Sequence, residues 1–97
     1  MIEWMTMETA MLLFDKVTKR YTENILALDN VTFSINRGEF SFLVGPSGAG
    51  KTTLMRLLIR EELPTSGNIV FDKIEVPKLP AKLLPKYRQR LGVVFQD

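Results

Sequence analysis

The sequence contains no cysteine and no histidine. The lack of cysteine excludes disulfide bonds and thiolate metal sites. The lack of histidine removes the most common general base and the most common metal ligand of enzymes. Any chemistry in this chain must therefore rely on lysine, threonine, glutamine, aspartate, glutamate and backbone groups.

Long apolar runs are missing as well. Residues 40–44 form one of the longest, whereas a membrane-spanning helix needs about 20 apolar residues. Residues 1–8 contain acids and no basic residue, so they lack the pattern of a secretory signal. The balance of 45% hydrophobic and 25% charged residues is that of an ordinary globular protein. We therefore expect a soluble, cytoplasmic protein that reaches a membrane only through a partner.

Charge is unevenly distributed, although the net charge is only +2. Residues 78–90 contain no acid, and their basic residues are Lys78, Lys82, Lys86, Arg88 and Arg90. Such a run is most often a solvated surface, and the alternative is a surface that docks on anionic lipid or on an acidic partner. We do not expect nucleic-acid binding, because the chain as a whole is not strongly basic and contains no known reading motif.

The start of the chain shows no regular pattern. Residues 1–10 have neither helical nor strand periodicity. We expect them to be a loose extension, with the fold carried by residues 11–97 and Met11 as an alternative natural start.

Two strands and two turns are predicted next. Residues 13–21 have the mixed, β-rich character of an edge strand, and residues 22–24 predict a turn. Apolar alternation over 28–35, with one slip at 29–30, indicates a second strand. Residues 36–39 predict another turn.

The middle of the sequence predicts a buried strand that leads into a helix. Residues 40–44 are a nearly continuous apolar run, as expected of a buried parallel strand. Leu54, Leu57 and Leu58 then follow the three- and four-residue spacing of a helix. Pro64 is expected to end that helix.

The last part of the chain predicts a hairpin, a short helix and a strand. Residues 68–72 and 73–76 have strand character and are expected to form the hairpin. Pro85 favours the first turn of a helix, which is expected over 85–90. Residues 91–95 are apolar and predict another buried strand.

Residues 45–53 read Gly-Pro-Ser-Gly-Ala-Gly-Lys-Thr-Thr and match the phosphate-binding loop, in which a glycine and four further residues precede Gly-Lys-Thr. Gly45, Gly48 and Gly50 allow successive backbone N–H groups to point inward around an anion. These donors precede the amino end of a helix, whose dipole also favours an anion. A glycine-rich turn without a ligand is the alternative.

The two residues that complete the loop suit a nucleoside triphosphate. Lys51 supplies a mobile charge for the β- and γ-phosphates, and the Thr52 hydroxyl is a hard oxygen ligand for Mg²⁺. The motif lies between an apolar strand and an amphipathic helix, which is the expected context. The sequence therefore predicts a site for ATP and Mg²⁺.

Two aspartates follow apolar runs and are candidates for a catalytic carboxylate. Asp72 comes soon after the loop and continues into a hairpin, so we interpret it as a surface turn residue. Asp97 is the last residue of the sequence. Neither is assigned the catalytic role.

Several segments resemble the ATP-binding cassette (ABC) ATPases. Residues 45–53 are similar to the Walker A loop of that family, residues 92–97 to its Q-loop, and residues 65–69 to the turn after the P-loop helix. The amino-acid sequence is even more similar to the cell-division members of the family, at residues 38–40, 42–44, 57–64 and 90–97. The resemblance covers about residues 12–97.

The resemblance implies roles for individual residues. Tyr21 matches the aromatic residue that stacks on adenine. Gln96 matches the glutamine that reaches Mg²⁺ and the attacking water, so Lys51 and Gln96 are the catalytic candidates and Thr52 and Gln96 the metal ligands. The residues expected to wrap the nucleotide are Gly45, Ser47, Gly48, Ala49, Gly50, Lys51, Thr52 and Thr53.

The resemblance also implies a fold and partners. We expect an α/β P-loop NTPase core, with an antiparallel β subdomain (about 12–36 and 68–76) against a parallel core strand and the P-loop helix. The expected partners are an integral-membrane subunit resembling FtsX and, in the complete protein, a second ATPase subunit. The expected location is the cytoplasmic face of the inner membrane, as a peripheral subunit.

Elements that complete ATP hydrolysis in this family are missing from the 97 residues: the signature loop, the Walker B strand with its glutamate, and the switch histidine. We therefore expect the chain to be the amino-terminal part of an ATPase domain, ending after the Q-loop. The alternatives are the ATPase of a lipoprotein- or macrolide-type exporter, a scaffold that binds nucleotide without hydrolysis, and a P-loop kinase. The Gln96 segment and the strands before the P-loop argue against a kinase.

Overall fold

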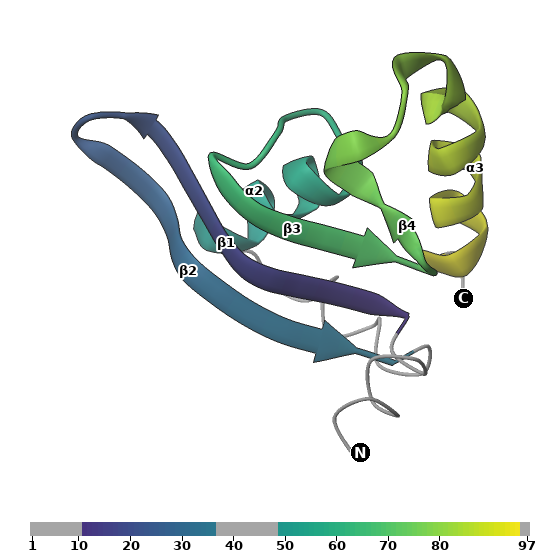
Figure 1. Cartoon of the computed structure of the whole chain (residues 1–97), viewed down its shortest axis with the longest axis horizontal. Coiled ribbons are helices and arrows are strands. Elements are labelled where there is room, and N and C mark those ends of the chain that lie inside the picture. Colours follow the sequence, from purple (N-terminus) through teal and green to yellow (C-terminus); the bar gives the residue numbers. More distant parts are fainter. Residues whose placement is uncertain (1–10, 37–48, 96–97) are drawn as a thin grey trace.

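The computed structural model describes residues 11–36 and 49–95 (Figure 1). Its elements are β1 (Leu12–Thr22), β2 (Ile25–Ile35), α2 (Ala49–Leu58), β3 (Ser66–Phe71), β4 (Ile74–Glu75), the 3-10 helices η2 (Val76–Lys78) and η3 (Ala81–Leu83), and α3 (Leu84–Phe95). The predictions for residues 1–10, for the turn after Asn36 and for the core strand at 40–44 lie outside the described residues.

The four strands form one antiparallel sheet in the order β2-β1-β3-β4. This confirms the predicted antiparallel subdomain, but the prediction that the first strand is an edge strand is wrong. β1 is interior, because it pairs with β2 on one side and with β3 on the other. Its mixed composition has another cause: Leu12, Phe14 and Val17 are buried, while Asp15 and Lys16 are exposed, as in a sheet with one solvated face.

The predicted slip in the second strand is a β-bulge. The register moves from Val17 opposite Val31 to Lys19 opposite Leu28, which leaves one extra residue on β2. Asn30 takes a φ of 53° there, a conformation that asparagine tolerates better than most residues. Its backbone N–H donates to Thr18 Oγ1 at 3.0 Å, so the bulge keeps a hydrogen bond.

Two turn geometries fix the position of β3. Gly67 has a φ of +90°, and a β-carbon on it would overlap the backbone carbonyl of Lys16. Only glycine therefore allows β3 to approach β1 this closely. At the other end of β3, Asp72 and Lys73 have φ of 48° and 70°, as the tight type I′ hairpin turn requires. The predicted hairpin and the interpretation of Asp72 as a turn residue are confirmed.

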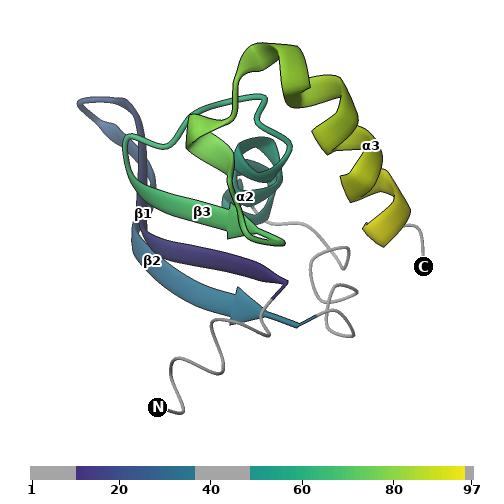
Figure 2. The same cartoon turned by 45° about the vertical axis from the view of Figure 1, so that its right-hand side comes forward.

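The core lies between the sheet and the two helices (Figure 2). Its fully buried side chains are Leu12, Phe14, Val17, Leu57, Leu58, Ile69, Phe71 and Val76. The rings of Phe14 and Phe33 stack with centroids 4.8 Å apart. The ring of Phe71 meets Tyr87 of α3 edge-on at 5.9 Å, which attaches α3 to the same core.

Helix α2 is confirmed, although it ends at Leu58, well before Pro64. The chain turns at Arg60, whose φ is 62°. Arg60 N donates to Leu57 O at 3.1 Å and Glu61 N to Arg56 O at 2.9 Å. This pair of bonds is a Schellman motif, which ends the helix without proline.

Helix α3 corrects the predictions for the end of the chain. The expected helix over 85–90 continues to Phe95, so the expected strand at 91–95 is wrong. Within the described residues every strand pairing is antiparallel and no strand lies beside this segment. A helix satisfies its backbone groups internally. Leu91 also continues the inward stripe of Leu84 and Tyr87 and is 3% exposed.

No helix among the described residues is long and apolar enough to cross a membrane.

Candidate functional site

The first turn of α2 carries the predicted phosphate-binding residues that the structure describes. The helix begins at Ala49 and Gly50, with Lys51 half-buried, Thr52 exposed and Thr53 buried. Thr53 shares the inward face of the helix with Leu57, four residues later. Gly45, Ser47 and Gly48 lie outside the described residues, as does Gln96.

The donor set at this end suits a triphosphate and a hard cation. The first turn of α2 contains no acidic residue, so no carboxylate from it opposes an anion at the positive end of the helix dipole. Lys51 adds a cation and Thr52 adds an exposed hydroxyl in the same turn. These residues would bind phosphate oxygens through N–H and ammonium donors, with the hydroxyl available to Mg²⁺.

The predicted metal site cannot be assembled from the described residues. Thr52 is described and Gln96 is not. Residues 11–36 and 49–95 contain no cluster of three or more acidic side chains that could hold a metal ion. Asp72, the described aspartate considered for catalysis, is half-buried and forms an ion pair with Arg90. It therefore holds the β3–β4 turn against α3.

Tyr21 lies near the end of β1 that carries the hairpin turn and is 40% exposed. Its hydroxyl donates to Glu62 Oε1 at 2.6 Å. Lys19 Nζ lies 5.1 Å from the centre of the Tyr21 ring and donates to Leu63 O at 2.8 Å. The ring is thus held in one orientation with an ammonium group over one face, and a stacked base would use the opposite face.

Glu62 is a residue that sequence reasoning missed. Its other oxygen lies 4.0 Å from Arg56 Nη1 of α2, so the carboxylate joins Tyr21 to the carboxyl end of the P-loop helix. A signal was present, because Glu61 and Glu62 follow a basic residue in the last turn of a helix. The structure therefore links Tyr21 to the end of α2 that is remote from Lys51.

Three further residues make contacts near the carboxyl end of α2 that the sequence did not predict. Tyr87 Oη donates to Leu58 O at 2.5 Å. Arg88 donates from Nε to Ile59 O at 2.9 Å and from Nη2 to Arg60 O at 3.2 Å. The Arg60 side chain donates from Nη1 to Val76 O of η2 and to Leu79 O just after it, each at 2.8 Å.

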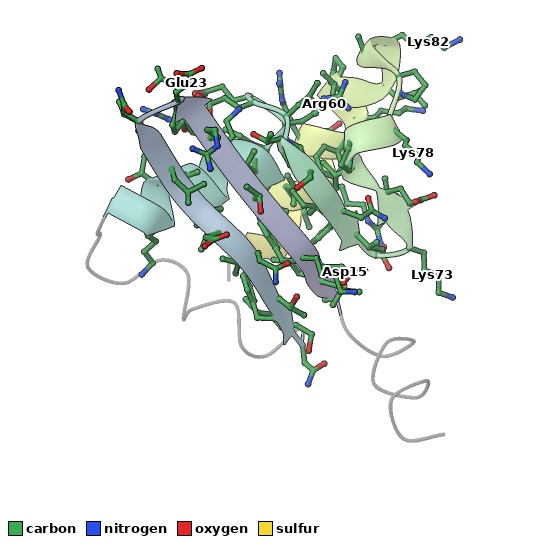
Figure 3. All side chains as sticks on the ribbon, turned by 60° about the vertical axis from the view of Figure 1, so that its left-hand side comes forward. Asp15, Glu23, Arg60, Lys73, Lys78 and Lys82 are labelled. Atoms are coloured by element: carbon green, nitrogen blue, oxygen red, sulfur yellow. The ribbon has the colours of Figure 1, made fainter. Side chains whose placement is uncertain are left out.

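The basic side chains of segment 78–90 are exposed, as predicted, but they do not form one uniform surface. Arg88 and Arg90 contact other parts of the fold. Figure 3 shows Lys78 and Lys82 pointing away from the body of the molecule, and Lys78 Nζ lies 3.3 Å from Glu75 Oε1. The charge available to a partner is therefore smaller than the sequence suggests.

Comparison with known proteins gives a consistent result. Residues 28–97 match the ABC transporter family. The cell division ATP-binding protein FtsE of Mycobacterium tuberculosis is 50% identical over 88 residues, which are 90% of this chain and 38% of that protein. FtsE of Escherichia coli is 40% identical over 87 residues, which are 90% of this chain and 39% of that protein.

Transport ATPases are similar as well. The spermidine/putrescine import ATP-binding protein PotA of Protochlamydia amoebophila is 44% identical over 86 residues, covering 89% of this chain and 21% of that protein. The chain thus spans less than two fifths of the length of these three relatives.

The fold is that of solved ATP-binding cassettes. The dimeric cassette MJ0796 in a post-hydrolysis state with ADP and Pi matches with a TM-score of 0.66 and 35% identity, over 81% of this chain and 35% of that one. The antiparallel sheet and helices described above therefore form the amino-terminal part of a cassette-like α/β fold.

Proposed function

The chain belongs to the ABC transporter family, and we propose that it is the amino-terminal part of an ATP-binding subunit that acts in a cell-division membrane complex. The observation that carries the ATP site is the first turn of α2. It begins within the Gly-Pro-Ser-Gly-Ala-Gly segment (45–50), presents Lys51 and Thr52, and contains no acid. This combination suits a triphosphate at the amino end of a helix.

The proposed roles follow the chemistry of each group. The loop residues Gly45, Ser47, Gly48, Ala49, Gly50, Thr52 and Thr53 would surround the phosphates, and Lys51 would hold the β- and γ-phosphates. Mg²⁺, when bound, would neutralise part of the charge of the phosphates. Thr52 and Gln96 would hold the ion, Gln96 would orient water, and Tyr21 would stack on the base. Hydrolysis belongs to the complete protein in this proposal.

The cell-division role is supported by the 50% identity to FtsE of M. tuberculosis, compared with 44% to PotA. We place the complete protein at the cytoplasmic face of the membrane, as a dimer bound to an integral-membrane subunit resembling FtsX. The similarity to PotA favours a second candidate, the ATP-binding subunit of an importer.

Replacing Lys51 by alanine tests the ATP site. Loss of one charge-assisted contact of about 1.5–3 kcal/mol should weaken ATP binding roughly 10- to 100-fold. Isothermal titration of the chain with Mg-ATP measures the effect. Lys86→Ala is the matched control, because Lys86 is an exposed lysine on α3 and should bind ATP as the parent does. Equal affinity of Lys51→Ala and the parent would show that the P-loop assignment is wrong.

The cell-division role needs a separate test in cells. Cells that lack the endogenous subunit should regain normal division with the complete protein and should lose it again with its Lys51→Ala variant. Restored uptake of a transport substrate without restored division would favour the importer.

A further inference from the structure

The carboxyl end of α2 has a complete set of hydrogen bonds, and half of them come from α3. The last four carbonyls of a helix have no partner inside it. At this end they are the carbonyls of Arg56, Leu57 and Leu58 and of Ile59, the residue that follows α2. The Schellman turn satisfies Arg56 O and Leu57 O, while Tyr87 satisfies Leu58 O and Arg88 satisfies Ile59 O. The end of the helix is therefore closed by a segment 29 positions later in the sequence.

Arg60 ties the same end to a third segment. It holds the left-handed position of the Schellman turn, which usually favours glycine. Its side chain offsets this cost by donating to Val76 O and Leu79 O. The carbonyl of Arg60 accepts from Arg88. Helix α2, the η2 segment and helix α3 are thus joined at one point.

Two guanidinium groups at this point suit the helix dipole. Arg60 and Arg88 lie at the negative, carboxyl end of α2, whereas Arg56 is paired there with Glu61 and Glu62. Burial raises the pKa of the Tyr87 phenol, and the Arg60 guanidinium lowers it by a smaller amount. The Tyr87 hydroxyl therefore stays protonated at neutral pH and remains a donor.

We propose that Arg88, assisted by Tyr87, is a positioning residue for phosphate binding, which fixes the axis of α2 from its carboxyl end. The inference rests on the proposed ATP site. A helix of ten residues is a rod of about 15 Å. A tilt of about 5° at one end would move the other end by about 1 Å, and a displacement of that size can cost about 100-fold in a positioned interaction. Such a tilt would displace Lys51 and the N–H groups of the first turn of α2.

The contacts of Arg88 also reduce the number of basic side chains that segment 78–90 can offer to a partner. Arg88 and Lys86 lie on opposite sides of α3, since residues follow one another at about 100° around a helix. Both residues are exposed, but the Arg88 side chain binds the carbonyls of Ile59 and Arg60 just after α2. A partner that moves α3 would therefore move the P-loop helix through Arg88, without touching the phosphates.

The test compares Arg88→Gln, Arg88→Lys and the control Lys86→Gln. Affinities for Mg-ATP, inorganic triphosphate and adenosine are measured on the chain, together with thermal unfolding without ligand. Arg88→Gln should weaken ATP and triphosphate binding by about fivefold or more, and leave adenosine binding unchanged. Arg88→Lys should be intermediate, because an ammonium group cannot reproduce the two-pronged contact of a guanidinium. Lys86→Gln should match the parent.

A purely structural role for Arg88 predicts a different pattern. Arg88→Gln would then unfold at a lower temperature, yet the folded protein would bind triphosphate as the parent does, and this result would overturn the proposal. If Arg88→Gln does not fold, Tyr87→Phe replaces it, because this change removes one donor and keeps the ring against Phe71. It should weaken triphosphate binding about twofold, and unchanged binding would again overturn the proposal. A parent chain that binds neither ATP nor triphosphate would instead refute the proposed function.

Discussion

The two ends of β1 are held in place by different interactions. At the end that begins the strand, Leu12 pairs with both Ile35 and Phe71, and Phe14 with both Phe33 and Ile69, without a register shift. Near the hairpin turn, the pairing with β2 shifts repeatedly. Polar side chains form hydrogen bonds where this strand pairing is interrupted.

Threonine hydroxyls accept several of these hydrogen bonds. Thr18 Oγ1 accepts from Asn30 N at 3.0 Å, and Thr65 Oγ1 accepts from Arg20 N at 2.9 Å. Thr65 N in turn donates to Thr18 O at 2.8 Å. The regular end of β1 buries apolar side chains and so stabilises the fold. The irregular end leaves Tyr21 exposed on the molecular surface. We expect mutations at the two ends to differ accordingly.

The largest effect is expected for Phe14→Ala. Phe14 is 1% exposed and stacks on Phe33, so its removal should lower the free energy of unfolding by about 3–5 kcal/mol. Urea denaturation measures the change. Glu23→Ala in the exposed turn after β1 is the comparison and should cost less than about 0.5 kcal/mol. Similar losses for the two variants would contradict the contrast between the ends.

Gly67→Ala tests the boundary between the two regions. The added methyl group would overlap the Lys16 carbonyl, and the φ of +90° is strained for alanine. We expect a loss of about 2–4 kcal/mol, combining overpacking with backbone strain. The midpoint of thermal unfolding reports it. A midpoint equal to that of the parent would show that β3 can move away from β1 at no cost.

A smaller effect is expected for Thr65→Val. The change preserves shape and removes the acceptor for Arg20 N. Because this site is exposed, water can replace part of the bond, and the expected loss of unfolding free energy is about 1 kcal/mol. Chemical denaturation measures it, with Ser34→Ala on β2 as a surface control. A loss as large as that of Phe14→Ala would mean that the irregular end also supplies core stability.

The smallest effect on stability, with a clear effect on binding, is expected for Tyr21→Ala. Tyr21 is 40% exposed and its hydrogen bond to Glu62 lies in solvent, so unfolding should change by less than about 0.5 kcal/mol. If adenine stacks on the ring, ATP affinity should fall about threefold to tenfold, since stacking contributes about 0.5–1.5 kcal/mol. Inorganic triphosphate should bind as it does to the parent. Unchanged ATP affinity would remove Tyr21 from the site.

Local patterns predicted those parts of the fold that depend on near neighbours. The slip at Asp29 and Asn30 is visible as a break in alternation, because a bulge changes which residues face the core. The Asp72–Lys73 turn was predicted from the strands that flank it, and α2 from the spacing of Leu54, Leu57 and Leu58. In each case the deciding contacts lie within a few residues along the chain.

The predictions failed where a residue far away in the sequence determines the local structure. The interior position of β1 depends on β3, which follows it by more than forty residues. An apolar run such as 91–95 fits a buried strand and a buried helix equally well, and a strand needs a neighbour. Arg88 was interpreted as part of a solvated or docking surface, because its partners, the carbonyls of Ile59 and Arg60 just after α2, carry no side-chain signal.

The sequence by itself predicted a P-loop with a helix after it, showed which family the chain resembles, and excluded cysteine and histidine chemistry. Only the tertiary structure decided that β1 is central, that α3 continues as one helix to Phe95, and that Tyr87 and Arg88 close the end of α2. The physical reason is the same in each case. Periodicity and motifs record what a residue needs from its immediate neighbours, whereas backbone carbonyls and strand edges gain their partners only when the chain is folded.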